Sequence, residues 1–137
     1  SCLVGSEMCI RDSFAAAHAI KHPSAGKCQN VHGHTYFVNI TVVGNKLQDN
    51  GFLVNFQELK RIAHGKYDHT LMNDHDWNGE QPSTEVVAKT IYKAVREALT
   101  AYDNKPQVLQ VIVRETPTSY VTYSEPLQEE TTNGSDY

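Results

Sequence analysis

Long hydrophobic runs, an excess of basic charge and paired cysteines are all missing from this chain of 137 residues. No apolar stretch approaches the roughly 20 residues that cross a bilayer as a helix, so we expect no membrane partner. The net charge is only -4 at pH 7, and residues 14–124 carry 11 Lys and Arg against 10 Asp and Glu. This balance argues against a nucleic-acid partner, because such proteins present a clustered basic face. Three cysteines form no disulfide framework, which favours a reducing, cytoplasmic setting.

The chain has the length of one domain, and its two ends differ in character from its middle. Residues 1–13 lack the basic start and long apolar stretch of a signal peptide, and residues 8–13 back-translate to a sequencing-library adapter. We therefore interpret residues 1–13 as a non-native or artefactual segment that replaces the start of the first strand. Residues 125–137 hold four acidic residues and no basic one, which predicts a disordered acidic tail. The functional domain is expected at residues 14–124.

Hydrophobic periodicity predicts an α+β fold. A capping-box pattern from Asn55 to Glu58 predicts a short helix, and apolar residues at helical spacing predict a long helix over 84–102. Alternating apolar and polar residues predict four strands, at 14–20, 32–42, 108–115 and 119–123. The order is strand, strand, helix, helix, strand, strand. It is typical of an antiparallel four-stranded sheet with two helices on one face.

His32 and His34 open the second predicted strand. Residues two apart in a strand share a face, so the two imidazoles project together, as two ligands of one ion must. His18 lies in the preceding strand and supplies a third imidazole from a neighbouring position. Three histidines with an open fourth position are typical of a catalytic zinc site. The alternative for any one of them is an ordinary core or surface histidine.

Cys28 lies four residues before His32, and two roles for its thiol stay open. As a fourth ligand beside the three histidines it closes a structural zinc site and is inert. As a free thiolate near positive charge it acts as a base or nucleophile.

Two later positions are candidates for acid–base chemistry and for substrate binding. His69 follows Asp68, and a carboxylate beside an imidazole makes a proton relay; the alternative is a solvated loop. Glu115 ends an apolar strand face, where it is either solvated at a rim or aimed into a pocket to accept paired N–H groups. The remaining histidines lack such context and are interpreted as surface residues: His22, His64 and His75.

Taken together, the motifs resemble the family of 6-pyruvoyl-tetrahydropterin synthases and 6-carboxytetrahydropterin synthases. The resemblance runs from about residue 14 to residue 123, and the spacing between Cys28 and His32 is similar to that of the carboxytetrahydropterin branch. Asn55 departs from the aspartate common in that branch, but Asn caps a helix as well as Asp does. The motifs that carry the resemblance are Phe14 to His18, Cys28 to His34, Gly51 to Phe56 with Leu59 and Lys60, Asp68 to Asn73, Pro82 to Ala88, and Glu115 with Thr116.

The resemblance implies a T-fold whose sheets join into a barrel across subunits, as a homohexamer of two trimers with active sites between subunits. It implies that His18, His32 and His34 bind Zn²⁺ and that Cys28 is the catalytic base. It further implies that Asp68 and His69 form a proton relay and that Glu115 anchors the pterin.

The implied activity is that of a zinc-dependent lyase acting on 7,8-dihydroneopterin triphosphate. In the favoured branch the products are 6-carboxy-5,6,7,8-tetrahydropterin, acetaldehyde and triphosphate, on the route to queuosine and other 7-deazapurines. One alternative stops at 6-pyruvoyl-tetrahydropterin without cleaving the side chain. A second alternative is a zinc-stabilised pterin-binding scaffold without turnover.

Overall fold

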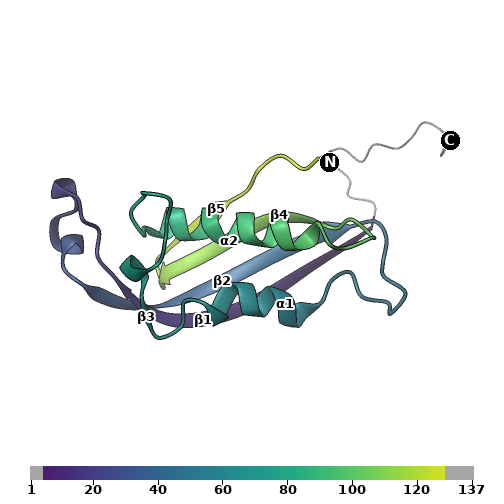
Figure 1. Ribbon diagram of the computed structural model, residues 1–137, viewed down its shortest axis with the longest axis horizontal. Coiled ribbons are helices and arrows are strands. Elements are labelled where there is room, and N and C mark those ends of the chain that lie inside the picture. Colours follow the sequence, from purple (N-terminus) through teal and green to yellow (C-terminus); the bar gives the residue numbers. More distant parts are fainter. Residues whose placement is uncertain (1–4, 129–137) are drawn as a thin grey trace.

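A five-stranded sheet forms the centre of the fold, and two α-helices cover one of its faces (Figure 1). The computed structural model describes residues 5–128. The strands lie in the order β3-β1-β2-β4-β5. Strand β3 runs parallel to β1, and the other neighbouring strands are antiparallel. The bounds are β1 Ser6–His18, β2 His32–Gly44, β3 Thr70–Leu71, β4 Gln107–Thr116 and β5 Ser119–Tyr123.

This architecture confirms the predicted α+β class, with one more strand than the four expected. The additional strand, β3, has only two residues and pairs with Ala16 and Ala17 of β1. A two-residue strand carries no periodic pattern, because alternation needs at least four residues to be recognised. The sequence therefore indicated an irregular segment where the structure has an edge strand.

The first strand begins earlier than predicted. Strand β1 pairs with β2 along its whole length, from Ser6 opposite Gly44 to His18 opposite His32, whereas the prediction was 14–20. Residues 6–13 join the sheet because antiparallel pairing uses backbone groups, which any side chain except proline permits. The interpretation of residues 1–13 as non-native stays a prediction, and residues 1–4 lie outside the described part.

Helix α1 (Phe56–Lys60) begins at the predicted cap and continues into a π-helical turn, η2 (Arg61–Gly65). The Asn55 side chain accepts a hydrogen bond from the backbone N–H of Gln57 at 2.9 Å, so asparagine does cap this helix. Helix α2 (Thr84–Leu99) is capped by the Ser83 hydroxyl and ends three residues before the predicted 102. Short 3₁₀ turns fill two connections, η1 (Pro23–Gln29) and η3 (Met72–Asp74).

The core lies between the helices and one face of the sheet. Phe14 stacks on Tyr36 with ring centroids 4.9 Å apart, alternate residues of β2 and β4 are buried, and α2 packs on β4 and β5. The alternation in β4 breaks at Leu109, because Thr41 pairs with Gln110 while Val42 pairs with Val108. This bulge buries Val108 and leaves Leu109 only partly buried. Fully buried members of the core include Tyr36, Val38, Ile40, Val42, Leu59, Met72, Val87, Ile91, Val95, Val111 and Val113.

The described end of the chain runs back along α2. Glu125 pairs with Arg96 at 2.6 Å, and Gln128 exchanges hydrogen bonds with Gln107. Of the predicted acidic tail at 125–137, residues 129–137 lie outside the described part. Among the described residues, no helix combines the length and the apolar character needed to cross a bilayer.

Candidate metal centre and proton relay

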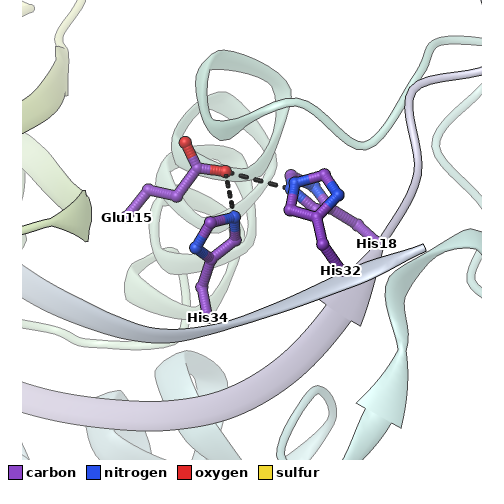
Figure 2. Close-up of side chains that lie close together, drawn as sticks. All are labelled: His18, His32, His34 and Glu115. Atoms are coloured by element: carbon purple, nitrogen blue, oxygen red, sulfur yellow. Dashed lines mark hydrogen bonds and ion pairs between the residues drawn. The ribbon is translucent and has the colours of Figure 1, made fainter. Parts of the chain in front are cut away.

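One end of the sheet gathers the three predicted histidines and Glu115 (Figure 2). His18 is the last residue of β1 and lies opposite His32, the first residue of β2. His34 follows two residues along β2, on the same face. Glu115 comes from β4, where the pairing with β5 skips it between Arg114 and Thr116. Such a bulge changes the direction of a side chain, and here the carboxylate points at the imidazoles.

The four side chains are close enough to share one ion. One ligand atom from each lies within 4.8 Å of the others. His18 Nε2 is 3.0 Å from His32 Nε2 and 3.0 Å from Glu115 Oε1. His34 Nε2 is also 3.0 Å from Glu115 Oε1. Among the described residues this is the only group of three or more His, Cys, Asp or Glu side chains with such convergence.

Backbone carbonyls determine the tautomer of two of the rings. His18 Nδ1 is 2.8 Å from the Pro82 carbonyl, and His32 Nδ1 is 2.7 Å from the Asn30 carbonyl. A carbonyl oxygen only accepts, so each Nδ1 must carry the proton. In the neutral rings both Nε2 atoms then present lone pairs, and these point toward each other. This is the arrangement found in metal sites, where an outer hydrogen bond orients each histidine.

The donor set fits a metal ion. A tetrahedral zinc ion with bonds of about 2.0–2.1 Å holds its ligands about 3.3 Å apart, close to the separations seen here. His34 Nε2 is buried and, although near Glu115, makes no hydrogen bond of acceptable geometry. Two facing lone pairs and a buried unpaired nitrogen are unfavourable without a cation between them. The group can therefore hold a metal ion, as the pattern of histidines predicted.

Glu115 dominates the electrostatics of this group. Its pKa lies below the usual range, chiefly because of the hydrogen-bond contact with His18, in which Nε2 donates when the ring is protonated; burial opposes this shift. Burial lowers the pKa of His18, but the contacts with Glu115 and the Pro82 carbonyl outweigh burial, so the net shift is upward. The pKa of His34 is lowered, first by burial and then by the neighbouring rings, against the pull of Glu115. Glu115 is thus an ionised group inside the site and not a solvated rim residue.

Tyr36 forms the inner wall of the site. Its ring lies edge-on to those of His18 and His34, with centroids 5.9 and 5.6 Å away. The hydroxyl is buried without a hydrogen-bond partner. Burial, and then the charge of Glu115, raises the pKa of Tyr36, so the phenol stays protonated.

Cys28 lies apart from the imidazole cluster. It belongs to the 3₁₀ turn η1, it is exposed, and its backbone carbonyl accepts a hydrogen bond from the Ile20 N–H at 2.7 Å. Its sulfur is not among the atoms that converge on the candidate ion. This placement does not support the alternative in which Cys28 completes a four-ligand structural site, and it leaves the thiol free.

Asp68 and His69 do contact each other directly, and both are anchored to the edge of β1. Asp68 Oδ2 is 2.8 Å from His69 Nδ1, while Asp68 Oδ1 accepts from the Ala15 N–H at 2.9 Å. The N–H of His69 donates to the Ala15 carbonyl at 2.6 Å. The pairing depends on a left-handed backbone at His69, with φ of 58°, that turns the ring back toward its neighbour. The His69 ring is exposed and makes no contact with the imidazole cluster in the described residues.

His64, interpreted from the sequence as a surface residue, has a partly exposed side chain that also approaches Asp68. Its Nδ1 is 2.7 Å from the Ser13 carbonyl, and its Nε2 is 3.6 Å from Asp68 Oδ2. The spacing of four residues between His64 and Asp68 was a signal for this contact, since such residues are neighbours on a helical turn. The signal was weak because no helix was predicted to reach residue 68. The other two histidines remain outside the site, with His22 capping η1 and His75 bonded to Thr70.

The chain belongs to the 6-pyruvoyl tetrahydropterin synthase family, whose sequence model matches residues 7–126. It is 59% identical over 115 residues to a 6-carboxy-5,6,7,8-tetrahydropterin synthase of Bacillus subtilis, covering 80% of this chain and 79% of that protein. It is 31% identical over 122 residues to an enzyme of the same name from Synechocystis, covering 83% and 89% of the two chains.

Other relatives carry the other name of the family. A 6-pyruvoyl tetrahydrobiopterin synthase of Drosophila melanogaster is 33% identical over 134 residues, with 85% of this chain and 77% of that protein covered. Among solved structures, the 6-pyruvoyl tetrahydropterin synthase of Caenorhabditis elegans superposes with a TM-score of 0.72 at 23% identity. The superposition covers 88% of this chain and 96% of that chain, which confirms the T-fold.

Proposed function

We propose that this chain is a zinc-dependent lyase that converts 7,8-dihydroneopterin triphosphate and water into 6-carboxy-5,6,7,8-tetrahydropterin, acetaldehyde and triphosphate. The observation that carries the proposal is the cluster of His18, His32 and His34 in a chain 59% identical to an enzyme named for this product. The product would serve the synthesis of queuosine and other 7-deazapurines.

In this proposal the three imidazoles hold Zn²⁺ through Nε2, because their Nδ1 atoms are committed elsewhere in at least two rings. When bound, the ion would supply Lewis-acid polarisation of the substrate side-chain hydroxyls. Tyr36 and the start of α2 close the inner side of the site. They exclude water from the oxygen atoms on which charge develops.

The acid–base steps are assigned to Cys28 and to the Asp68–His69 pair. Cys28 takes a proton from the substrate side chain as thiolate, which its exposure and its place outside the converging imidazoles allow. Asp68 accepts the Nδ1–H of His69, which leaves His69 Nε2 to receive or deliver a proton. Because His69 is exposed at the sheet edge, we propose that it works at a boundary between subunits of a homohexamer.

Glu115 is assigned to the pterin ring. An ionised carboxylate with two oxygens accepts paired N–H groups from a 2-aminopyrimidinone, and its lowered pKa keeps it ionised. Its contact with His18 and His34 also allows service as a fourth ligand. The variant E115Q, in which an amide nitrogen replaces one carboxylate oxygen, separates the two roles.

The decisive experiment incubates the purified, zinc-loaded protein with 7,8-dihydroneopterin triphosphate and measures triphosphate, acetaldehyde and pterin products. We expect acetaldehyde in a one-to-one ratio with 6-carboxytetrahydropterin. Triphosphate release without acetaldehyde would instead assign the reaction of the pyruvoyl branch. Binding of the pterin without release of triphosphate or acetaldehyde would instead indicate a zinc-stabilised pterin-binding scaffold without turnover.

The same preparation tests the oligomer. Light scattering on the eluting protein gives the mass directly, and six copies are expected from the proposed assembly of two trimers. A monomeric mass for a fully active protein would exclude active sites shared between subunits.

A further inference from the structure

Two imidazoles approach the Asp68 carboxylate, and only one of them, His69, belongs to the proposed relay. His69 Nδ1 approaches Asp68 Oδ2 at 2.8 Å, and His64 Nε2 approaches the same oxygen at 3.6 Å. The other oxygen, Oδ1, is occupied by the Ala15 N–H. The carboxylate therefore has one oxygen bound to the strand and one oxygen between two imidazoles.

The orientation of the His64 ring follows from its other contact. Nδ1 lies 2.7 Å from the Ser13 carbonyl, which only accepts, so Nδ1 is protonated. This places Nε2 on the side of Asp68. The Nδ1 edge also lies 3.9 Å from Asp12 Oδ1, so the ring sits between two carboxylates and a carbonyl.

These surroundings favour the imidazolium form of His64. The hydrogen bond to the Ser13 carbonyl raises the pKa of His64 most; slight burial opposes it, and the charges of Asp12 and Asp68 add to the rise. In that form Nε2 carries a proton toward Asp68. Within residues 5–128, the charged neighbours that act on the ring are both acids: Asp12 on β1 and Asp68 after η2.

We propose that His64 is a positioning residue for the Asp68–His69 pair, holding the Asp68 carboxylate in the orientation that receives the Nδ1–H of His69. The inference rests on the proposed function, in which His69 moves protons. His64 touches neither substrate nor the candidate ion. It acts through Asp68, by limiting rotation of the carboxylate about its side-chain bonds.

Two amide variants separate the two edges of the ring. An asparagine amide reaches where Nδ1 lies, so H64N keeps the bond to the Ser13 carbonyl and loses the contact with Asp68. A glutamine amide reaches where Nε2 lies, so H64Q keeps an N–H toward Asp68 and loses the Ser13 contact. We expect H64N to lower kcat about tenfold with unchanged KM, well short of the roughly 10²–10⁴-fold that acid–base catalysis contributes as a whole. We expect H64Q to retain most of kcat.

A second measurement does not depend on turnover. Coupling between two charged groups is reciprocal, so loss of the Asp68 charge must lower the pH at which His64 titrates. We expect this shift in the His64 imidazole resonances of D68N and none in D103N, which removes a carboxylate from an exposed position elsewhere. D68N retains an oxygen for the Ala15 N–H, so the anchor to β1 survives.

Three results would overturn the proposal: wild-type kcat in H64N, loss of kcat in H64Q but not in H64N, or an unshifted His64 titration in D68N. The second result would assign His64 to holding the Ser13 carbonyl, a structural role. A wild-type protein that forms no product refutes the proposed function alone, because the titration still decides whether His64 and Asp68 are coupled.

Discussion

His18 and His32 face each other across the last pair of the β1–β2 ladder with their Nε2 atoms 3.0 Å apart. Each ring has its Nδ1 turned to a backbone carbonyl, so in the neutral state two lone pairs oppose each other. A cation between the two Nε2 atoms removes this repulsion, because it accepts both lone pairs. The carbonyls of Pro82 and Asn30 thus orient the two imidazoles for metal binding before any ion binds.

The first prediction concerns zinc. We expect one zinc per chain by elemental analysis after dialysis against zinc, and loss of that zinc in H32A, because two imidazoles bind far more weakly than three. Free zinc at 100 times its dissociation constant should stabilise the folded chain by about 2.7 kcal/mol, through binding to the native state only. H22A, which removes an exposed histidine from η1, is the matched control and should keep the metal. Equal zinc content in H32A and H22A would exclude the site.

The second prediction concerns the free thiol. We expect C28A to keep its zinc and to lose turnover, because the sulfur lies outside the converging ligand atoms. C9A removes another exposed thiol and should leave both zinc and turnover unchanged. A fall in zinc content in C28A would restore the structural-site reading of Cys28.

The third prediction separates the two roles of Glu115. E115Q keeps the size of the side chain and removes its charge. If Glu115 anchors the pterin, E115Q retains zinc and binds the substrate at least tenfold more weakly, since charge-assisted hydrogen bonds contribute about 1.5–3 kcal/mol. Titration calorimetry with the pterin and elemental analysis on the same sample give the answer. Loss of zinc with E115Q would make the carboxylate a ligand.

The fourth prediction concerns acid stability and Asp68. The Ala15 N–H, and then the hydrogen bond to His69, hold the pKa of Asp68 below its ordinary value of 3.8. A lowered native pKa means that the ionised carboxylate stabilises the fold above the unfolded pKa, and that this contribution is lost as pH falls through the native pKa. The difference in unfolding free energy between wild type and D68N should therefore be present at pH 7 and shrink below pH 3.8. Urea unfolding at several pH values measures it, and a difference that grows toward low pH would contradict the assignment.

The fifth prediction concerns the core under α2. Ile91 is fully buried against the sheet, so I91A should lower the unfolding free energy by about 2–5 kcal/mol through lost burial and the cavity that remains. L47A removes an exposed leucine and should change it by no more than about 0.5 kcal/mol. A similar loss of unfolding free energy in I91A and L47A would show that Ile91 is not part of the packed core.

Several parts of the site were predictable because they depend on local spacing. His32 and His34 share a face since strand side chains alternate, and the apolar run that follows them specifies which face is buried. The capping position Asn55 likewise predicted helix α1, and the helical spacing of apolar residues predicted helix α2. The predicted relay partners Asp68 and His69 are adjacent in the chain, and their direct contact depends on the left-handed backbone at His69, which the sequence did not predict.

What the sequence alone determined is therefore the two α-helices, the four longer strands and the identity of the candidate ligands, since periodicity and spacing are local properties. The tertiary structure decided three further things. It brought Glu115 from β4 onto the imidazoles through a bulge, it left Cys28 outside their cluster, and it bound Asp68 to the Ala15 N–H of β1. Each depends on register or on the course of a connecting turn. These are set by packing between segments far apart in the chain, which no local pattern encodes.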